Sequence, residues 1–221
     1  MKKLFLGLLA AFTVSPVMAQ DPLITKWKTH HSMGCMLVRD CEDGIVKITQ
    51  TSELTTILGS NYSDYQEEID GIISELEKMG VDVYLAPDRY FVRNVAGSYY
   101  TVGNDFFLND SYSRDPHQLI KTLRHEAWHA AQDAMAGTID NSLIAIIRSE
   151  EDVPREFALL AEIAYSPAAR PWEAEAKWAG STPGMTLEVL KIINETNGRP
   201  WEVIDPTPLT REYLVNEGYI K

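Results

Sequence analysis

The chain has 221 residues, with 20 Lys and Arg against 32 Asp and Glu, and a formal net charge of -12 at pH 7. We do not expect so acidic a protein to bind nucleic acid, because the phosphate backbone would repel it. With 45% hydrophobic and 24% charged residues, the composition is typical of a globular protein and not of a disordered one. Two cysteines are too few for a disulfide-framework mini-protein or a four-thiolate zinc ribbon.

Residues 1–19 have the features of a cleavable signal peptide. Lys2 and Lys3 give a cationic start, residues 4–14 are uncharged and mostly apolar, and Ala19 offers a small residue before a cleavage site. The apolar run has about eleven residues, against the roughly twenty that a membrane-spanning helix needs. We therefore expect a protein that is exported, either periplasmic or secreted, and that has no membrane span.

The two cysteines, Cys35 and Cys41, lie six positions apart in an N-terminal segment of residues 20–60. On one straight strand they would be roughly 20 Å apart, whereas a disulfide needs Cα atoms within about 7 Å. Because free thiols do not persist well outside the cytoplasm, we expect a loop closed by a disulfide. The alternative is a strand with two free thiols, one of which could cap a metal ion.

Hydrophobic spacing predicts a helix, then a small sheet, then further helices. In the N-terminal segment, a turn signal at 42–44 between apolar pieces at 35–38 and 45–48 predicts a small hairpin. The expected helices are residues 62–79, ending before Gly80, and 116–136, opened by Asp115-Pro116 and ended by Gly137, then 153–165, 171–179, 186–196 and a short one near 211. The expected strands are residues 81–85, 90–93, 98–102 and 105–108.

The expected helix 116–136 carries the pattern H-E-x-x-H, as His125-Glu126-Ala127-Trp128-His129. With about 100° of rotation per residue, both imidazoles and the intervening carboxylate lie on one side of this helix. The opposite side carries an apolar stripe, made of Ile120, Leu123, Ala127, Ala130, Ala131 and Ala134. The helix is therefore predicted to be buried on one side and to present polar ligands on the other.

Neutral imidazole suits Zn²⁺, and His125 and His129 can bind one ion at about 2.0–2.1 Å from each nitrogen. Glu126 is too near the first ligand to complete the tetrahedron, but it is well placed to take a proton from a water at the open position. The alternative is a pair of surface or packing histidines beside a solvated glutamate. The helical context favours one Zn²⁺ per chain, with Glu126 as general base.

On this motif and its context the sequence resembles the zincin metallopeptidases. In that superfamily a backing helix, a small sheet and the H-E-x-x-H helix follow one another in this order, as residues 62–136 do here. The metzincin branch is excluded, because its motif needs Gly and His where this chain has Gln132 and Met135. The resemblance implies an α+β, zincin-like fold over residues 61–221, with a small mixed sheet and a mainly helical C-terminal part.

No His follows the motif, so a third ligand downstream must be a carboxylate, as in the gluzincins. Residues 171–177 resemble the E-x-E-A segment of several gluzincin families, in which Glu173 matches the zinc-binding Glu. Lys177 stands where many of those families have Asp, and an exposed Glu173–Lys177 ion pair is the alternative. The other carboxylates considered as third ligand are Glu175, which lies about 200° away on the helix, Glu162 and Glu156.

Three further roles are expected around this site. Asp133 lies near the ligand side of the helix and is either the partner of a ligand imidazole or a solvated acid, and Tyr165 is the candidate to stabilise an oxyanion. The resemblance implies that residues 105–108 form the edge strand to which extended substrate adds. Residues 20–60 would then cover a sheet face or lie over the cleft.

The sequence thus predicts a metallopeptidase that hydrolyses peptide bonds with a metal-activated water, acting on a peptide or protein substrate. His125, His129 and Glu173 would hold the zinc. The alternative is a zincin-like protein that binds a peptide or partner without cleaving it. The presence of Glu126 favours the enzyme, because a binding protein needs no base beside the metal.

Overall fold

The computed structural model describes residues 35–37, 41–101, 103–136, 144–149, 151–167 and 169–196. The expected signal peptide, the expected helix near residue 211 and Gly137 lie outside these residues. In the described part of the chain, no helix is long and apolar enough to cross a membrane.

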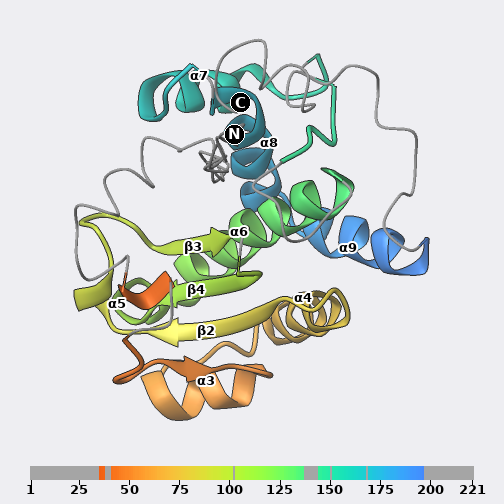
Figure 1. The fold of residues 1–221 in the computed structure, drawn as a ribbon. Helices are drawn as coiled ribbons and strands as arrows, with labels where there is room; N and C mark the ends of the chain where they lie inside the picture. The colour runs from red at the N-terminus through yellow and green to blue at the C-terminus, as the bar shows by residue number, and fades with distance from the viewer. Residues whose placement is uncertain are drawn as a thin grey trace, which may run out of the picture.

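A four-stranded mixed sheet lies at the centre of the fold, in the order β1-β2-β4-β3 (Figure 1). Strand β2 (Asp82–Ala86) pairs in parallel with β4 (Asp105–Asn109), and the outer strands β1 (Val46–Lys47) and β3 (Gly97–Tyr100) pair antiparallel with β2 and β4. This arrangement confirms the prediction of a mixed α+β fold with a small sheet.

Strand β4 is central, so the prediction that residues 105–108 form the edge strand is wrong. Every residue of β4 is buried, as expected for an apolar run covered on both faces of a sheet. A short connection folds β3 back antiparallel onto one side of β4, while β2 occupies the other side. The edge of the sheet next to β4 is therefore formed by β3, and the opposite edge by β1.

Two other strand predictions are wrong. Residues 90–93 form no strand, because a 3-10 helix, η1 (Asp88–Tyr90), is followed by a turn. The apolar character of this segment reflects packing instead, since Tyr90 and Phe91 are buried in one cluster with Phe107. The hairpin around residues 42–44 is also absent from the described chain, because residues 35–37 are helical and β1 pairs with β2.

The disulfide prediction is confirmed. Cys35 and Cys41 are bonded, with their Cα atoms 5.2 Å apart. The Cys41 N–H donates to the Cys35 carbonyl oxygen at 3.2 Å, so the segment closes on itself as a loop.

The described helices agree with the predicted ones, apart from the helical residues 35–37 and two helices that the pattern did not indicate, α3 (Thr51–Leu58) and α5 (Asp110–Ser113). The others are α4 (Gln66–Lys78), α6 (Pro116–Ala136), α7 (Arg155–Ala164), α8 (Arg170–Ser181) and α9 (Met185–Glu195). Helix α6 contacts β3 and β4 on one side and α8 on another (Figure 1). It is the element that connects the sheet to the C-terminal helices.

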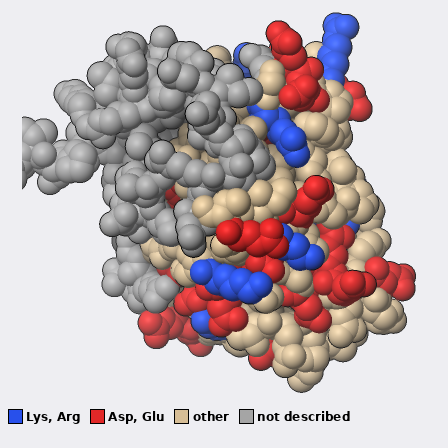
Figure 2. Space-filling model, turned by 90° about the vertical axis from the view of Figure 1, so that its right-hand side faces the viewer, with Lys and Arg blue, Asp and Glu red and all other residues tan. Residues whose placement is uncertain are grey.

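The main core forms where α4 and α6 pack with the sheet. The predicted apolar stripe of α6 lies in this core, with Ile120, Leu123, Ala127, Ala130 and Ala131 buried and Ala134 partly buried. The described part of the N-terminal segment joins the same core through Ile48, Leu54 and Leu58. On the outside, acidic side chains with basic ones between them spread over the described surface shown in Figure 2, in keeping with the net charge of -12.

A buried ion pair joins α4, α6 and the start of α9. The Arg124 guanidinium donates to both Glu68 carboxylate oxygens, at 2.8 and 2.6 Å, and the Gly184 N–H donates to the same carboxylate at 2.8 Å. Burial opposes ionisation of Glu68, but these donors outweigh it and hold the pKa of the carboxyl below its usual value. The pair therefore stabilises the packing of three helices around the core.

Replacing Glu68 with Gln should lower the free energy of unfolding at pH 7 by on the order of 3 kcal/mol, because Arg124 stays buried without its partner. Since the pKa of Glu68 is lower in the folded than in the unfolded chain, the ion pair stabilises the wild type above about pH 4.3. This stabilisation is lost as the pH falls through the folded pKa. Urea unfolding at pH 7 and below pH 4 measures both effects. Glu67→Gln, in the same turn but exposed, is the control and should change stability by less than about 0.5 kcal/mol; equal effects of the two variants would contradict this prediction.

Candidate metal centre

Helix α6 presents His125, Glu126 and His129 on the side away from its buried apolar stripe. The helix begins as predicted, with the Asp115 carboxylate accepting from the His117 N–H at 2.9 Å and Pro116 as the first helical residue. His129 is buried, and His125 is partly exposed. The amphipathic pattern of the sequence thus orients the motif towards β3 and α8.

Helix α8 supplies the third side chain of the site. Its first turn carries Glu173, which is 6% exposed. The helices approach closely at Gly180, where an added Cβ would lie 3.1 Å from the Lys121 carbonyl oxygen and 3.2 Å from the His125 Cβ. A glycine at this position therefore lets Glu173 reach the two imidazoles.

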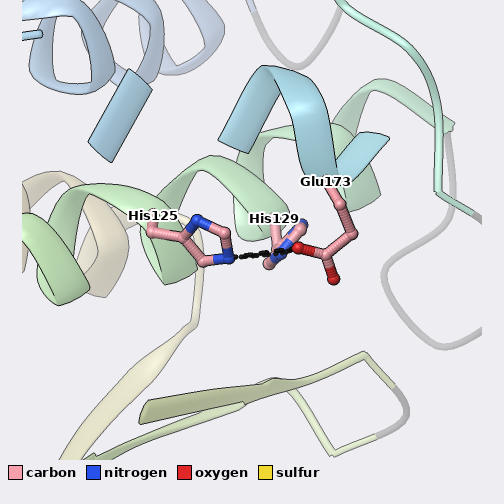
Figure 3. A group of neighbouring side chains, drawn as sticks. All are labelled: His125, His129 and Glu173. Carbon is pink, nitrogen blue, oxygen red and sulfur yellow. Dashed lines mark hydrogen bonds and ion pairs between the residues drawn. The ribbon is translucent and has the colours of Figure 1, made fainter. Parts of the chain in front are cut away.

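Three ligand atoms converge between α6 and α8 (Figure 3). The two imidazole Nε2 atoms are 3.3 Å apart, and Glu173 Oε2 lies 3.3 Å from Nε2 of His125 and 3.8 Å from Nε2 of His129. This buried carboxylate oxygen has no hydrogen-bond donor. His125, His129 and Glu173 form a group that could hold a metal ion.

The separations fit the geometry of a tetrahedral ion. Ligands at about 2.0–2.1 Å from a tetrahedral zinc are about 3.3–3.4 Å from one another, which matches two of the observed distances, while the third, between Glu173 Oε2 and Nε2 of His129, is longer at 3.8 Å. Burial opposes ionisation of Glu173, but the two imidazoles and a hydrogen bond from Tyr165 outweigh it and hold the pKa of its carboxyl below the usual value. The donor set, two imidazoles and one carboxylate, is one that zinc and related divalent ions accept.

The other carboxylates considered as ligands are not part of this group. Glu175 is fully buried on another side of α8, where it accepts from Trp128 and Gln132. Glu156 and Glu162 are exposed on α7. Lys177 makes no described ion pair with Glu173; its ammonium lies 5.0 Å from the centre of the Tyr165 ring.

Glu126 lies beside the ligand group and contacts the edge strand. Its Oε2 accepts from the Tyr99 N–H at 2.9 Å, so this amide of β3 faces α6 and not β4. Burial raises the pKa of Glu126 to about 7. An added Cβ at Gly97 would lie 3.1 Å from the Glu126 Cγ, which shows how closely β3 approaches the carboxylate.

Asp133 is not the partner of a ligand imidazole. Its Oδ2 lies 2.7 Å from the hydroxyl of Tyr99, so the residue holds β3 against α6. The partner of His129 is Gln132, whose Oε1 lies 2.8 Å from Nδ1 of His129. No motif in the sequence pointed to Gln132 as this partner, although its position three residues after His129 puts it on the same side of the helix.

A cleft of about 420 Å³ opens over the ligand group. Its walls come from β3, α6, α7 and α8, and the residues that line it include Ser98, Glu126, Phe157, Tyr165 and Trp172. None of the described residues 41–60 lines the cleft; those residues pack on the sheet and core instead. The cleft thus combines a possible metal site, a carboxylate and the edge of a sheet.

Comparisons with models of protein families, with curated proteins and with solved structures each gave no match. The assignment of a metal centre therefore depends on the motif and on the geometry of this chain.

Replacing Gly180 with Ala should push α8 away from α6, because the new Cβ would meet the Lys121 carbonyl oxygen and the His125 Cβ. We expect a loss of about 1–3 kcal/mol in the free energy of unfolding and weaker metal binding, since Glu173 moves away from the histidines. Isothermal titration with zinc and urea unfolding measure the two effects.

The matched control is Gly71→Ala in α4, where the added Cβ meets only the flexible Leu187 side chain at 3.0 Å. Metal affinity of this control should equal that of the wild type. Unchanged zinc binding by the Gly180 variant would show that the close approach of the helices does not govern the site.

Proposed function

We propose that the protein is a zinc-dependent peptidase, in which His125, His129 and Glu173 hold one Zn²⁺ and Glu126 is the general base. The observation that carries the proposal is the convergence of the three ligand atoms beside Glu126, on a cleft bordered by β3, an outer strand of the sheet in the described chain. The order of backing helix, small sheet and motif helix, which resembles the zincins, agrees with it.

A bound zinc ion would supply Lewis-acid chemistry, acidifying a water molecule and polarising the substrate carbonyl. Glu126 would accept the proton of the attacking water and then pass it to the leaving amine. In the metal-free chain burial raises the pKa of this carboxyl to about 7, and the charge of a bound ion would favour its ionised form, which is the form that accepts the proton. The Tyr99 N–H keeps this carboxylate at the wall of the cleft, where its free oxygen can face the water.

Strand β3 is the element that we propose to align the substrate. Among the described residues it pairs only with β4, and Gly97, Ser98 and Tyr99 line the cleft. An extended peptide can add to such an edge through backbone hydrogen bonds. Because the Tyr99 N–H already donates to Glu126, the pairing would use other backbone groups of this strand. Within the described chain, the buried Ser98 Oγ has no hydrogen-bond partner, which makes it a candidate contact for the substrate backbone.

The disulfide supports the proposal that the protein acts outside the cytoplasm. A Cys35–Cys41 bond persists in the periplasm or outside the cell and is rare in the reducing cytoplasm. Together with the signal-peptide pattern of residues 1–19, it favours an exported peptidase.

The purified mature protein should contain close to one zinc per chain, and His129→Ala should lose it. Glu126→Gln should keep the zinc, because Glu126 is not a ligand, and should cleave unfolded protein substrates about 10²–10⁴-fold more slowly. Metal analysis and mass-spectrometric mapping of the cleavage products give both readouts.

Glu156→Gln, an exposed substitution on α7, is the control and should cleave at the wild-type rate. Equal rates for wild type and Glu126→Gln would refute the peptidase. Full zinc content without cleavage by the wild type would instead support the alternative, a zincin-like binding protein.

A further inference from the structure

A row of buried polar groups runs from the metal-ligand group into the contact between α6 and α8. Nδ1 of His129 lies 2.8 Å from Oε1 of Gln132, and Nε2 of Gln132 lies 2.8 Å from Oε2 of Glu175. The same Nε2 also donates to the Trp172 carbonyl oxygen at 3.2 Å. Gln132 and Glu175 are both 0% exposed, so bulk water does not reach these side chains.

The partners of Gln132 determine which way its amide points. Its Nε2 lies near two oxygens, the carbonyl oxygen of Trp172 and a carboxylate oxygen of Glu175. The carbonyl oxygen can only accept a hydrogen bond, and the other neighbours of the Glu175 carboxylate all donate to it. A flipped amide would bring its own oxygen against both, leaving buried acceptors without donors. The amide nitrogen therefore faces Glu175, and the amide oxygen faces His129.

This orientation determines the tautomer of His129. Since Oε1 of Gln132 can only accept, Nδ1 of His129 must carry the proton. A neutral imidazole then has its lone pair on Nε2, the atom that lies 3.3 Å from Nε2 of His125 and 3.8 Å from Glu173 Oε2. That is the tautomer that can bind a metal ion through Nε2.

Glu175 is held in place by donors from two other parts of the chain. Trp128 Nε1 of α6 donates to it at 3.2 Å and the Ile147 N–H at 3.1 Å, and the Arg148 N–H also donates. With Gln132, all four neighbours are donors, so the carboxylate serves only as an acceptor. Its position, and with it that of Gln132, is therefore determined by the packed structure and not by side-chain rotation.

We propose that Gln132, held by Glu175, is a positioning residue that keeps His129 in the Nδ1–H tautomer and directs its Nε2 into the metal-ligand group. Glu175 thereby acts through Gln132, although the sequence pattern made it a candidate ligand. The proposal uses the metal-binding part of the proposed function and is independent of peptidase activity.

Gln132→Met tests the proposal, because Met has a similar length and shape but cannot make any of the three hydrogen bonds of the Gln132 amide. Zinc affinity, measured by competition with a chelator, should fall about 10–100-fold. In the metal-free protein, ¹⁵N–¹H correlation spectra of the imidazoles should show His129 as the Nδ1–H tautomer in the wild type and as a mixture in Gln132→Met.

The control is Thr186→Val on α9, which removes a buried hydrogen bond to the Arg124 carbonyl oxygen but no hydrogen bond of Gln132, Glu175 or His129. This variant should be less stable in urea yet bind zinc with an affinity within about threefold of the wild type. A loss of about 10–100-fold is expected only when the hydrogen-bond partner of a metal ligand is removed. If both variants lose zinc affinity equally, Gln132 acts through packing alone and the proposal is overturned.

An Nε2–H tautomer of His129 in the wild type, or wild-type zinc affinity in Gln132→Met, would also overturn it. A wild type that binds no zinc would refute the metal centre itself. In that case the tautomer of His129 still decides the role of Gln132.

Discussion

The candidate site depends on one contact, the burial of the Glu173 carboxylate against two imidazoles between α6 and α8. A buried carboxylate oxygen without a hydrogen-bond donor, such as Glu173 Oε2, is costly, and a cation or metal ion close to it lowers that cost. Here the nearest polar atoms of Oε2 are the Nε2 atoms of His125 and His129, at 3.3 and 3.8 Å. A contact of this kind destabilises an empty site and favours an occupied one, because any ion that binds the folded chain adds to its stability.

Helix α6 transmits this arrangement to the rest of the molecule. Its apolar stripe is part of the main core, while Glu126 and Asp133 on other sides contact Tyr99 of β3 through the backbone amide and the hydroxyl. Burial and the neighbouring Asp133 raise the pKa of Tyr99, so its hydroxyl stays protonated as a donor. The edge strand β3 is therefore fixed to the helix that carries the motif, and both line the same cleft.

The sequence predicted the parts of this structure that local patterns determine. Three- and four-residue apolar spacing identified α4 and α6, and the motif identified the side of α6 that faces the site. Strand order could not be obtained in this way, because the central place of β4 depends on pairing with β2, about twenty residues away. Gln132 was missed for a similar reason: its role arises from Glu175 and Trp172, which come from another helix.

The two glutamates of the E-x-E segment show how α8 can contribute to a metal site in two ways. Glu173 faces the imidazoles, and Glu175, about 200° further around the helix, faces Gln132 and the backbone of residues 147–148. One rigid helix thus carries both the carboxylate of the ligand group and the group that orients the partner of His129. Any movement of α8 relative to α6 would disturb both at once, so metal affinity should depend on the docking of these helices more steeply than on either glutamate alone.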